Sequence, residues 1–146
     1  MNFNPNSSRD FAKQTQSPLQ SGWYTCRLVS VMWFPGNRYN RMSFRLSVIQ
    51  GFRQGKTFQA NLTWGLDFTD EKTGQVISSD ESSNAKLAII AEICGVDLAM
   101  LEGNDNPADW ADMLNECSGQ RMTVQIKFWS NEKVSEGYNL IQVRKA

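Results

Sequence analysis

The chain has 146 residues, 40% of them hydrophobic, and it carries 15 basic and 15 acidic residues. This length and composition fit one folded domain with its own core and argue against disorder over the whole chain. The sequence has no histidine, and its three cysteines are far apart with no Cys-x-x-Cys pair. Zinc sites built on Cys and His are therefore excluded, as is nucleophilic catalysis by Ser-His or Cys-His. We expect no enzyme, no metal site and no cofactor.

Residues 1–20 are polar, rich in Asn, Ser and Gln, and lack the apolar segment of a secretory signal. They are typical of a flexible N-terminal tail, so we expect the folded domain to span 21–146. No apolar run approaches the roughly 18 residues that a membrane helix needs. We therefore expect a cytoplasmic protein without a membrane partner.

The zero net charge conceals a segregation of charge along the chain. Residues 1–64 hold eight basic residues and one acid, residues 65–117 hold twelve acids and two lysines, and residues 118–146 hold five basic residues and two acids. The three segments therefore carry +7, −10 and +3. Such a distribution creates fields that the net value hides, and it predicts one basic and one acidic surface.

Alternating apolar and polar residues predict the strands of the first half. Segments 23–31, 41–49 and 56–64 are rich in β-branched and aromatic residues, and turns at 35–37 and 51–55 separate them. In the second strand the alternation predicts a buried row of Met42, Phe44, Leu46 and Val48 and a basic outer row of Arg41, Ser43, Arg45 and Ser47. In the third strand Gln59 and Asn61 are predicted to face outward, and Trp64 to face the core.

The acidic segment predicts a helical insert. Residues 66–83 are polar and indicate a loop, with a small hairpin at 73–76. Apolar residues at helical spacing predict a helix over 84–95 that ends at Gly95. Asn106 and Pro107 suit the start of a second helix, whose apolar face includes Trp110. Strands are again predicted at 121–129 and 138–145.

The order of three strands, a helical insert and two strands is that of an OB-fold. This mainly β fold is a five-stranded Greek-key barrel, here with the insert between strands three and four. An SH3-like barrel lacks a helix at this position, and a ferredoxin-like sheet needs a helix after its first strand, where none is predicted.

The sequence WFPGNRYNR, residues 33–41, is unusual for the loop between the first two strands because it combines aromatic rings with arginines. A single nucleic-acid strand is bound without sequence selection by cations for its phosphates and aromatic rings for its bases. In an OB-fold this loop, strands two and three, and the loop between strands four and five flank the ligand groove. The candidate nucleic-acid-binding residues are Trp33, Phe34, Arg38, Tyr39, Arg41, Arg45, Phe52, Arg53, Lys56, Lys127 and Trp129.

Other interpretations stay open. Trp33 and Phe34 could instead cap the end of the barrel, and a basic strand face could be ordinary solvated surface. The exposed aromatics and arginines also suit an adaptor or structural barrel that binds proteins. A nuclease would need a metal site among the insert acids Asp67, Asp70, Glu71, Asp80 and Glu81, but their spacing is not that of an EF-hand. The position of Trp23 is not predicted.

Over residues 20–144 the sequence resembles a family of small bacteriophage proteins encoded beside replication and recombination genes. The likeness lies in the Gly-x-Tyr entry at 22–24, in the glycine turn V-x-x-G-x-x-x-G-K at 48–56, and in the Leu/Ala/Ile helix ending Cys-Gly at 94–95. The resemblance implies an OB-fold protein that binds single-stranded DNA in phage replication or recombination, with replication proteins or further copies of itself as additional partners. Many such proteins recruit partners through an acidic tail, whereas this sequence closes with QVRKA.

Overall fold

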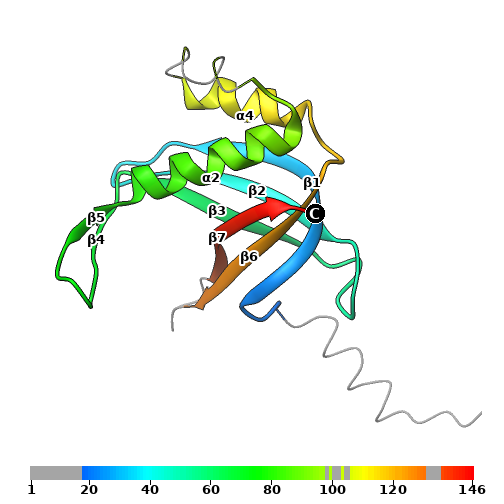
Figure 1. Cartoon of the computed structure of the whole chain (residues 1–146), viewed down its shortest axis with the longest axis horizontal. Helices are drawn as coiled ribbons and strands as arrows, with labels where there is room; N and C mark the ends of the chain where they lie inside the picture. The colour runs from blue at the N-terminus through cyan, green and yellow to red at the C-terminus, as the bar shows by residue number, and fades with distance from the viewer. Residues whose placement is uncertain (1–17, 98, 100–102, 104–105, 131–135) are drawn as a thin grey trace, which may run out of the picture.

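The computed structural model describes residues 18–97, 99, 103, 106–130 and 136–146 and is mainly β, with one five-stranded mixed sheet, a small hairpin and two helices (Figure 1). The large sheet contains β1 (Gly22–Phe34), β2 (Asn40–Val48), β3 (Thr57–Trp64), β6 (Arg121–Ser130) and β7 (Glu136–Lys145). The hairpin is β4 (Asp67–Thr69) with β5 (Val76–Ser78), and the helices are α2 (Ser79–Cys94) and α4 (Pro107–Asn115). The predicted element order is thus confirmed.

Each strand of the large sheet has two hydrogen-bonded neighbours. β1, β2 and β3 follow one another as antiparallel neighbours, and β6 pairs antiparallel with both β7 and β1. The remaining pairing joins β3 and β7 in parallel, at Ala60 with Tyr138 and Asn61 with Asn139. The strand order of the mixed sheet is therefore β1-β2-β3-β7-β6, with β6 reaching β1 over residues 22–27.

β1 is longer than predicted, and a bulge bends it. Leu28 pairs with Leu46 and Ser30 with Arg45, so Val29 is the extra residue and lies exposed. Beyond the bulge the ladder continues through Trp33 with Met42 and Phe34 with Arg41. The prediction that Trp33 and Phe34 belong to the loop was therefore wrong, because their backbone continues the pairing with β2.

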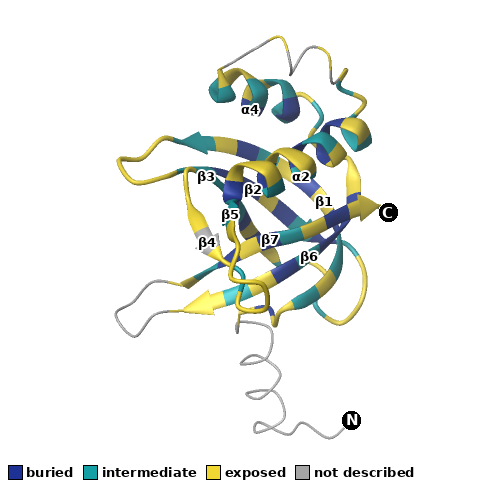
Figure 2. Cartoon of the chain, turned by 60° about the vertical axis from the view of Figure 1, so that its left-hand side comes forward, coloured by how far each residue is buried: buried dark blue, intermediate teal, exposed yellow. Residues whose placement is uncertain are grey.

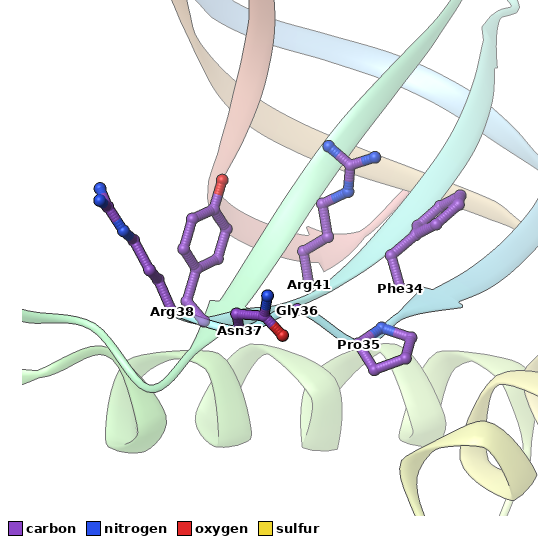
Figure 3. A pocket seen from close by; sticks show the side chains of 7 residues that line it. Phe34, Pro35, Gly36, Asn37, Arg38 and Arg41 are labelled. Atoms are coloured by element: carbon purple, nitrogen blue, oxygen red, sulfur yellow. The ribbon is translucent and has the colours of Figure 1, made fainter.

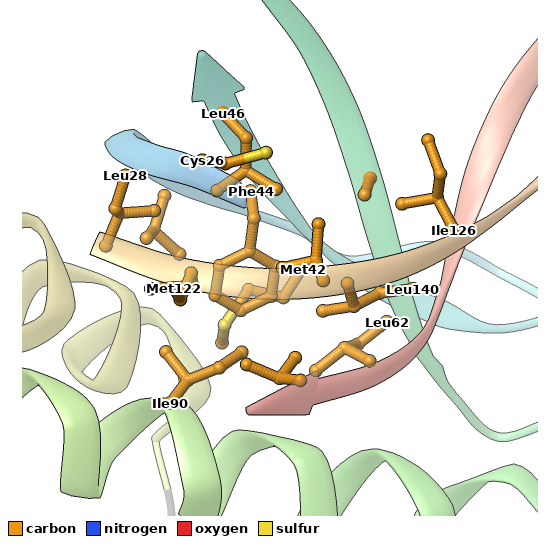
Figure 4. Close-up of a cluster of buried hydrophobic side chains, with 14 of the residues drawn as sticks. Cys26, Leu28, Met42, Phe44, Leu46, Leu62, Ile90, Met122, Ile126 and Leu140 are labelled. Carbon is orange, nitrogen blue, oxygen red and sulfur yellow. The ribbon is translucent and has the colours of Figure 1, made fainter. Parts of the chain in front are cut away.

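The alternation in β2 correctly predicted the core. Met42, Phe44, Leu46 and Val48 are all buried, and Phe44 lies among apolar side chains from several strands and from Ile90 of α2 (Figure 4). Figure 2 shows buried and exposed positions along the strands, and alternation is broken where Ser43 of β2 and Thr123 of β6 are buried as well. Buried aliphatic and aromatic side chains of this kind each stabilise a fold by about 1.5–3 kcal/mol relative to exposure.

Helix α2 begins five residues before the predicted start, at Ser79 rather than Asn84. Ser78 caps it, since its side chain accepts a hydrogen bond from the backbone N–H of Asp80. Asp80 and Glu81 lie in the first turn, where negative charge is favourable beside the helix dipole. The last part of the predicted loop, from Ser78 onward, therefore forms the cap and the start of the helix. Gly95 ends the helix in the left-handed conformation, as expected.

Helix α4 is docked on β1 through Asn115. Asn106 caps its start and Pro107 follows, as predicted. The Asn115 carboxamide accepts a hydrogen bond from the Val31 N–H at 2.6 Å and donates one to the Val31 carbonyl at 2.6 Å. Because β6 pairs with β1 only as far as Arg27, these bonds satisfy Val31 backbone groups on the edge of β1 that no strand reaches.

Two further predictions concern the small hairpin and the N-terminal tail. The small hairpin is present, with Thr69 paired to Val76 across the turn. The predicted flexible tail, 1–20, lies outside the described residues up to position 17. Leu19 belongs to the fold, because it is buried and its backbone N–H donates to the Tyr138 hydroxyl at 2.7 Å.

Candidate nucleic-acid interface

The outer face of β2 and β3 carries a row of polar side chains. Ser43 lies opposite Asn61, and Arg45 lies opposite Gln59. Because side chains alternate along a strand, these residues point away from the core that Met42 and its neighbours fill. The Ser43 hydroxyl donates to the carboxamide oxygen of Asn61, which fixes the orientation of that amide.

Two open hollows meet on this face. The first, of about 350 Å³, is lined by Phe34, Pro35, Gly36, Asn37, Arg38, Tyr39 and Arg41. The second, of about 420 Å³, is lined by Arg41, Ser43, Gln59, Asn61, Trp129, Glu136, Gly137 and Tyr138. Arg41 lines both, so we treat them as one groove and call it the β2–β3 groove. It runs from the β1–β2 loop across β2 and β3 to the end of β6 and the start of β7.

Arg41 is positioned by Phe34. Its guanidinium carbon lies 4.6 Å from the centroid of the Phe34 ring, and the two residues are paired across β1 and β2. Figure 3 shows Phe34, Arg38 and Arg41 extending from the loop region to the side away from α2. A guanidinium held flat over a ring keeps its hydrogen-bond donors at the edges, where a phosphate oxygen can accept from them.

Trp129 closes the far side of the groove. It is paired with Gly137 across β6 and β7, and 37% of its surface is exposed. Since Gly137 has no side chain, the indole can lie over the backbone of β7 rather than project into solvent. A broad exposed ring fixed at a groove wall is a surface on which a nucleic-acid base can stack.

The structure thus brings together five of the predicted site residues, namely Phe34, Arg38, Tyr39, Arg41 and Trp129. Arg45 is beside them, exposed and paired with the groove residue Gln59. Positive charge and exposed aromatic rings therefore share one groove.

Four other candidates are not among the residues that line the groove. Phe52, Arg53 and Lys56 belong to the β2–β3 turn, at the end of β2 opposite the β1–β2 loop. Arg53 approaches the Tyr24 and Tyr138 hydroxyls. Burial raises the pKa of both tyrosines, and the positive charge of Arg53 opposes that rise. Lys127 lies two residues before Trp129 on β6, opposite Asn139.

Trp33 is a packing residue in this structure. It is half-buried against the core, and its ring meets that of Trp64 edge to face at a centroid distance of 5.7 Å. The Trp64 indole in turn donates to the Asn84 side chain of α2 at 2.8 Å. The bulge in β1 turns Trp33 inward, so its ring lies at the edge of the core rather than on the outer face.

Sequence reasoning did not select the groove residues Ser43, Gln59 and Asn61, nor Met32 beside them. Ser43, Gln59 and Asn61 were recognised as outward-facing, but only charge and aromaticity were used to select site residues. Met32 is exposed and lies opposite Ser43. It was missed because the bulge that points it outward cannot be recognised from the pattern of apolar and polar residues in β1. A search for all outward residues of two adjacent strands would have found the first three.

The acids proposed as an alternative metal site do not gather. Over the described part of the chain, no three residues among His, Cys, Asp and Glu lie close enough to hold a metal ion. The Asp70 carboxylate accepts from the Lys72 N–H, and the Asp80 carboxylate accepts from the Gly65 N–H at 2.7 Å. These carboxylates act within turns and at the start of α2.

No protein-family model matches this chain, and the search of curated proteins found no match. In the residues that the structure covers, neither helix combines the length and apolar character needed to cross a bilayer. The bearing of the groove on function therefore rests on its chemistry.

Proposed function

We propose that this protein binds single-stranded DNA without strong sequence preference, as an OB-fold domain. The observation that carries the proposal is the junction at Arg41, where a ring-supported arginine lies between an aromatic loop and an exposed tryptophan. The fold supports it, since the ring of strands β1-β2-β3-β7-β6 with α2 and α4 between β3 and β6 follows the OB-fold order.

Each part of the groove matches one part of a nucleic-acid strand. Arg41 and Arg38 hold phosphate oxygens, while Trp129 and Tyr39 stack on bases. Asn61, whose oxygen is occupied by Ser43, directs its amide N–H groups toward a phosphate or a base carbonyl. Because stacking uses the flat face common to all bases, it tolerates changes of sequence.

The biological setting follows from the family resemblance. A sequence-tolerant binder encoded by a phage would protect or present unpaired DNA during replication or recombination. In this proposal the protein acts without enzymatic activity, and the energy of binding comes from stacking and from release of counterions.

Titration with a single-stranded oligonucleotide at two salt concentrations, followed by the tryptophan fluorescence of the protein, tests the proposal. We expect quenching of tryptophan fluorescence and an affinity that falls steeply with salt. Arg41→Ala should lower the slope of log affinity against log salt by about 0.7, the value for one phosphate contact on a single strand. Lys72→Ala, which removes a positive charge from the β4–β5 turn, is the matched control and should leave the slope unchanged.

Two results would contradict the proposal. One is negligible affinity for oligonucleotides near physiological salt, which would favour the adaptor hypothesis. The other is an Arg41→Ala variant that remains folded and binds like wild type, which would remove the groove from the interaction.

A further inference from the structure

A second basic surface lies on the outer face of β1, β6 and β7. We define it by four exposed residues, Trp23 and Arg27 on β1, Arg121 on β6 and Arg144 on β7. Only the end of β6 near Trp129 and the start of β7 line the β2–β3 groove, so this surface occupies the other half of both strands. None of its residues was a candidate from the sequence.

Strand register places the four residues in adjacent rows. Trp23 lies opposite Gln125, Thr25 opposite Thr123, and Arg27 opposite Arg121. Thr123 is also paired with Arg144 of β7, so Arg144 lies beside the middle row. The hydroxyls of Thr25 and Thr123 are 3.2 Å apart and hydrogen-bonded, which ties the strands together between Trp23 and the two opposed arginines.

Two arginines directly opposite each other are unfavourable without an anion between them. Like charges at a cross-strand pair destabilise a sheet. Over the described residues, no ion pair connects Arg27 or Arg121 to a carboxylate. β1 and β6 contain no acidic residue, and the one acid of β7, Glu136, lies at the groove end. The pair is therefore suited to hold a phosphate.

The arrangement at Trp23 repeats the one at Phe34. The Arg144 guanidinium carbon lies 4.4 Å from the Trp23 ring centroid, as Arg41 lies 4.6 Å from that of Phe34. Trp23 is 41% exposed, so part of its ring remains accessible. Each surface thus offers a supported guanidinium beside an exposed aromatic ring, which suits phosphate and base together.

β6 connects the two surfaces. Its outward positions follow in order from Trp129 through Lys127 and Gln125 to Arg121. At about 3.4 Å per residue this line is about 27 Å long. Lys127 is exposed between the two surfaces and supplies a cation close to the groove end of this line.

We infer that a single strand leaving the groove at Trp129 continues along the outer face of β6 to the second basic surface. This inference rests on the proposed function and deepens it. Lys127 contacts a phosphate on the way, Arg27 and Arg121 hold another between them, and a base stacks against Trp23. The alternative occupant of the second basic surface is the acidic segment 65–117 of another copy of this chain. The test below distinguishes that occupant from DNA.

Oligonucleotide length provides the test. A strand of about 6 nucleotides fills only the groove, while one of about 20 nucleotides reaches both surfaces. We compare Arg27→Ala/Arg121→Ala with Lys72→Ala/Lys86→Ala, a control that loses the same charge from the β4–β5 turn and from α2. For the long strand, the arginine variant should lose about tenfold in affinity and its salt slope should fall by about 0.7, the value for the one phosphate that the two arginines hold. Affinity for the short strand should not change, nor should the control differ from wild type with either strand.

Two further variants guard against a folding artefact. Arg144→Gln changes one exposed side chain and should weaken only the long strand, by about threefold. Trp23→Phe should reduce the fluorescence quenching caused by the long strand while leaving that caused by the short strand intact. The melting temperature of Arg27→Ala/Arg121→Ala should equal or exceed that of wild type, because removing opposed like charges relieves repulsion.

Equal losses for the short and long strands, or no loss for the long strand, would overturn the inference. So would an arginine variant whose only change is weaker self-association in analytical ultracentrifugation, since that would assign the surface to a second copy. If wild type fails to bind even the short strand, it is the proposed function itself that fails, and this outcome is distinct from the others.

Discussion

The indole of Trp129 occupies the space where a side chain at Gly137 would lie. A Cβ added to Gly137 would meet the Cζ2 atom of the indole at 2.7 Å and the Cε2 atom at 3.0 Å. The two residues are directly paired across β6 and β7. The absence of a side chain at 137 is therefore what allows the tryptophan to lie flat at the wall of the groove.

Gly137→Ala should displace Trp129 without unfolding the protein. Gly137 is not among the glycines with positive φ, so alanine suits its backbone, and the atoms that must move belong to a side chain. We expect affinity for single-stranded DNA to fall by an amount close to that of Trp129→Ala, about 1–3 kcal/mol for one stacked base. Titration of the two single variants and the double variant measures this. A double variant much weaker than either single variant would show that the two residues act independently.

Glu136→Gln should strengthen binding. Glu136 lines the groove together with Arg41, and its carboxylate repels the phosphates that Arg41 attracts. Because Glu136 is exposed and screened by water, we expect a gain of about twofold to fivefold at low salt, decreasing as salt is raised. Asp112→Asn on the exposed face of α4 makes the same change of charge and should have a smaller effect. Equal gains from both variants would indicate a general field rather than a groove contact.

Trp33→Ala and Trp129→Ala should differ in their effect on stability. Trp33 packs against the core and against Trp64, so its removal leaves a cavity and breaks an aromatic pair. We expect the free energy of unfolding to fall by about 2 kcal/mol and the melting temperature by about 4–8 °C. Trp129→Ala should change stability by less than about 0.5 kcal/mol. Thermal denaturation followed by circular dichroism distinguishes them, and a stable Trp33→Ala variant with impaired DNA binding would restore Trp33 to the site.

Stability should decrease at alkaline pH because of Cys26. Burial raises the pKa of this thiol from an ordinary 9.0 to about 12, so the folded state keeps its proton over a range in which the unfolded state loses it. The unfolded state is therefore favoured progressively as pH rises from about 9 toward about 12. Urea denaturation between about pH 8 and about pH 10 should show a loss in wild type that is smaller in Cys26→Ala, whose overall stability is lower. The same pH dependence in both proteins would assign the effect to other groups, such as Tyr24 and Tyr138, whose pKa values burial also raises.

Local sequence patterns were enough to predict most of the elements and the core of β2. Alternation in β2 identified Met42, Phe44, Leu46 and Val48 as buried, because a period of two can bury only one face of a strand. Gly95, Asn106 and Pro107 marked helix ends through local backbone chemistry. Features of this kind depend on residues a few positions apart, which is why they could be read without a structure.

Which residues share a surface depends on long-range strand pairing, which local patterns do not reveal. The bulge after Leu28 turned Trp33 inward and Met32 outward, and its position depends on how β1 pairs with two different strands. The register of β6 against β7 placed Trp129 over Gly137, and that of β1 against β6 placed Arg27 opposite Arg121. These contacts join residues up to about a hundred positions apart, and a shift of one residue in register would send every side chain to the opposite face.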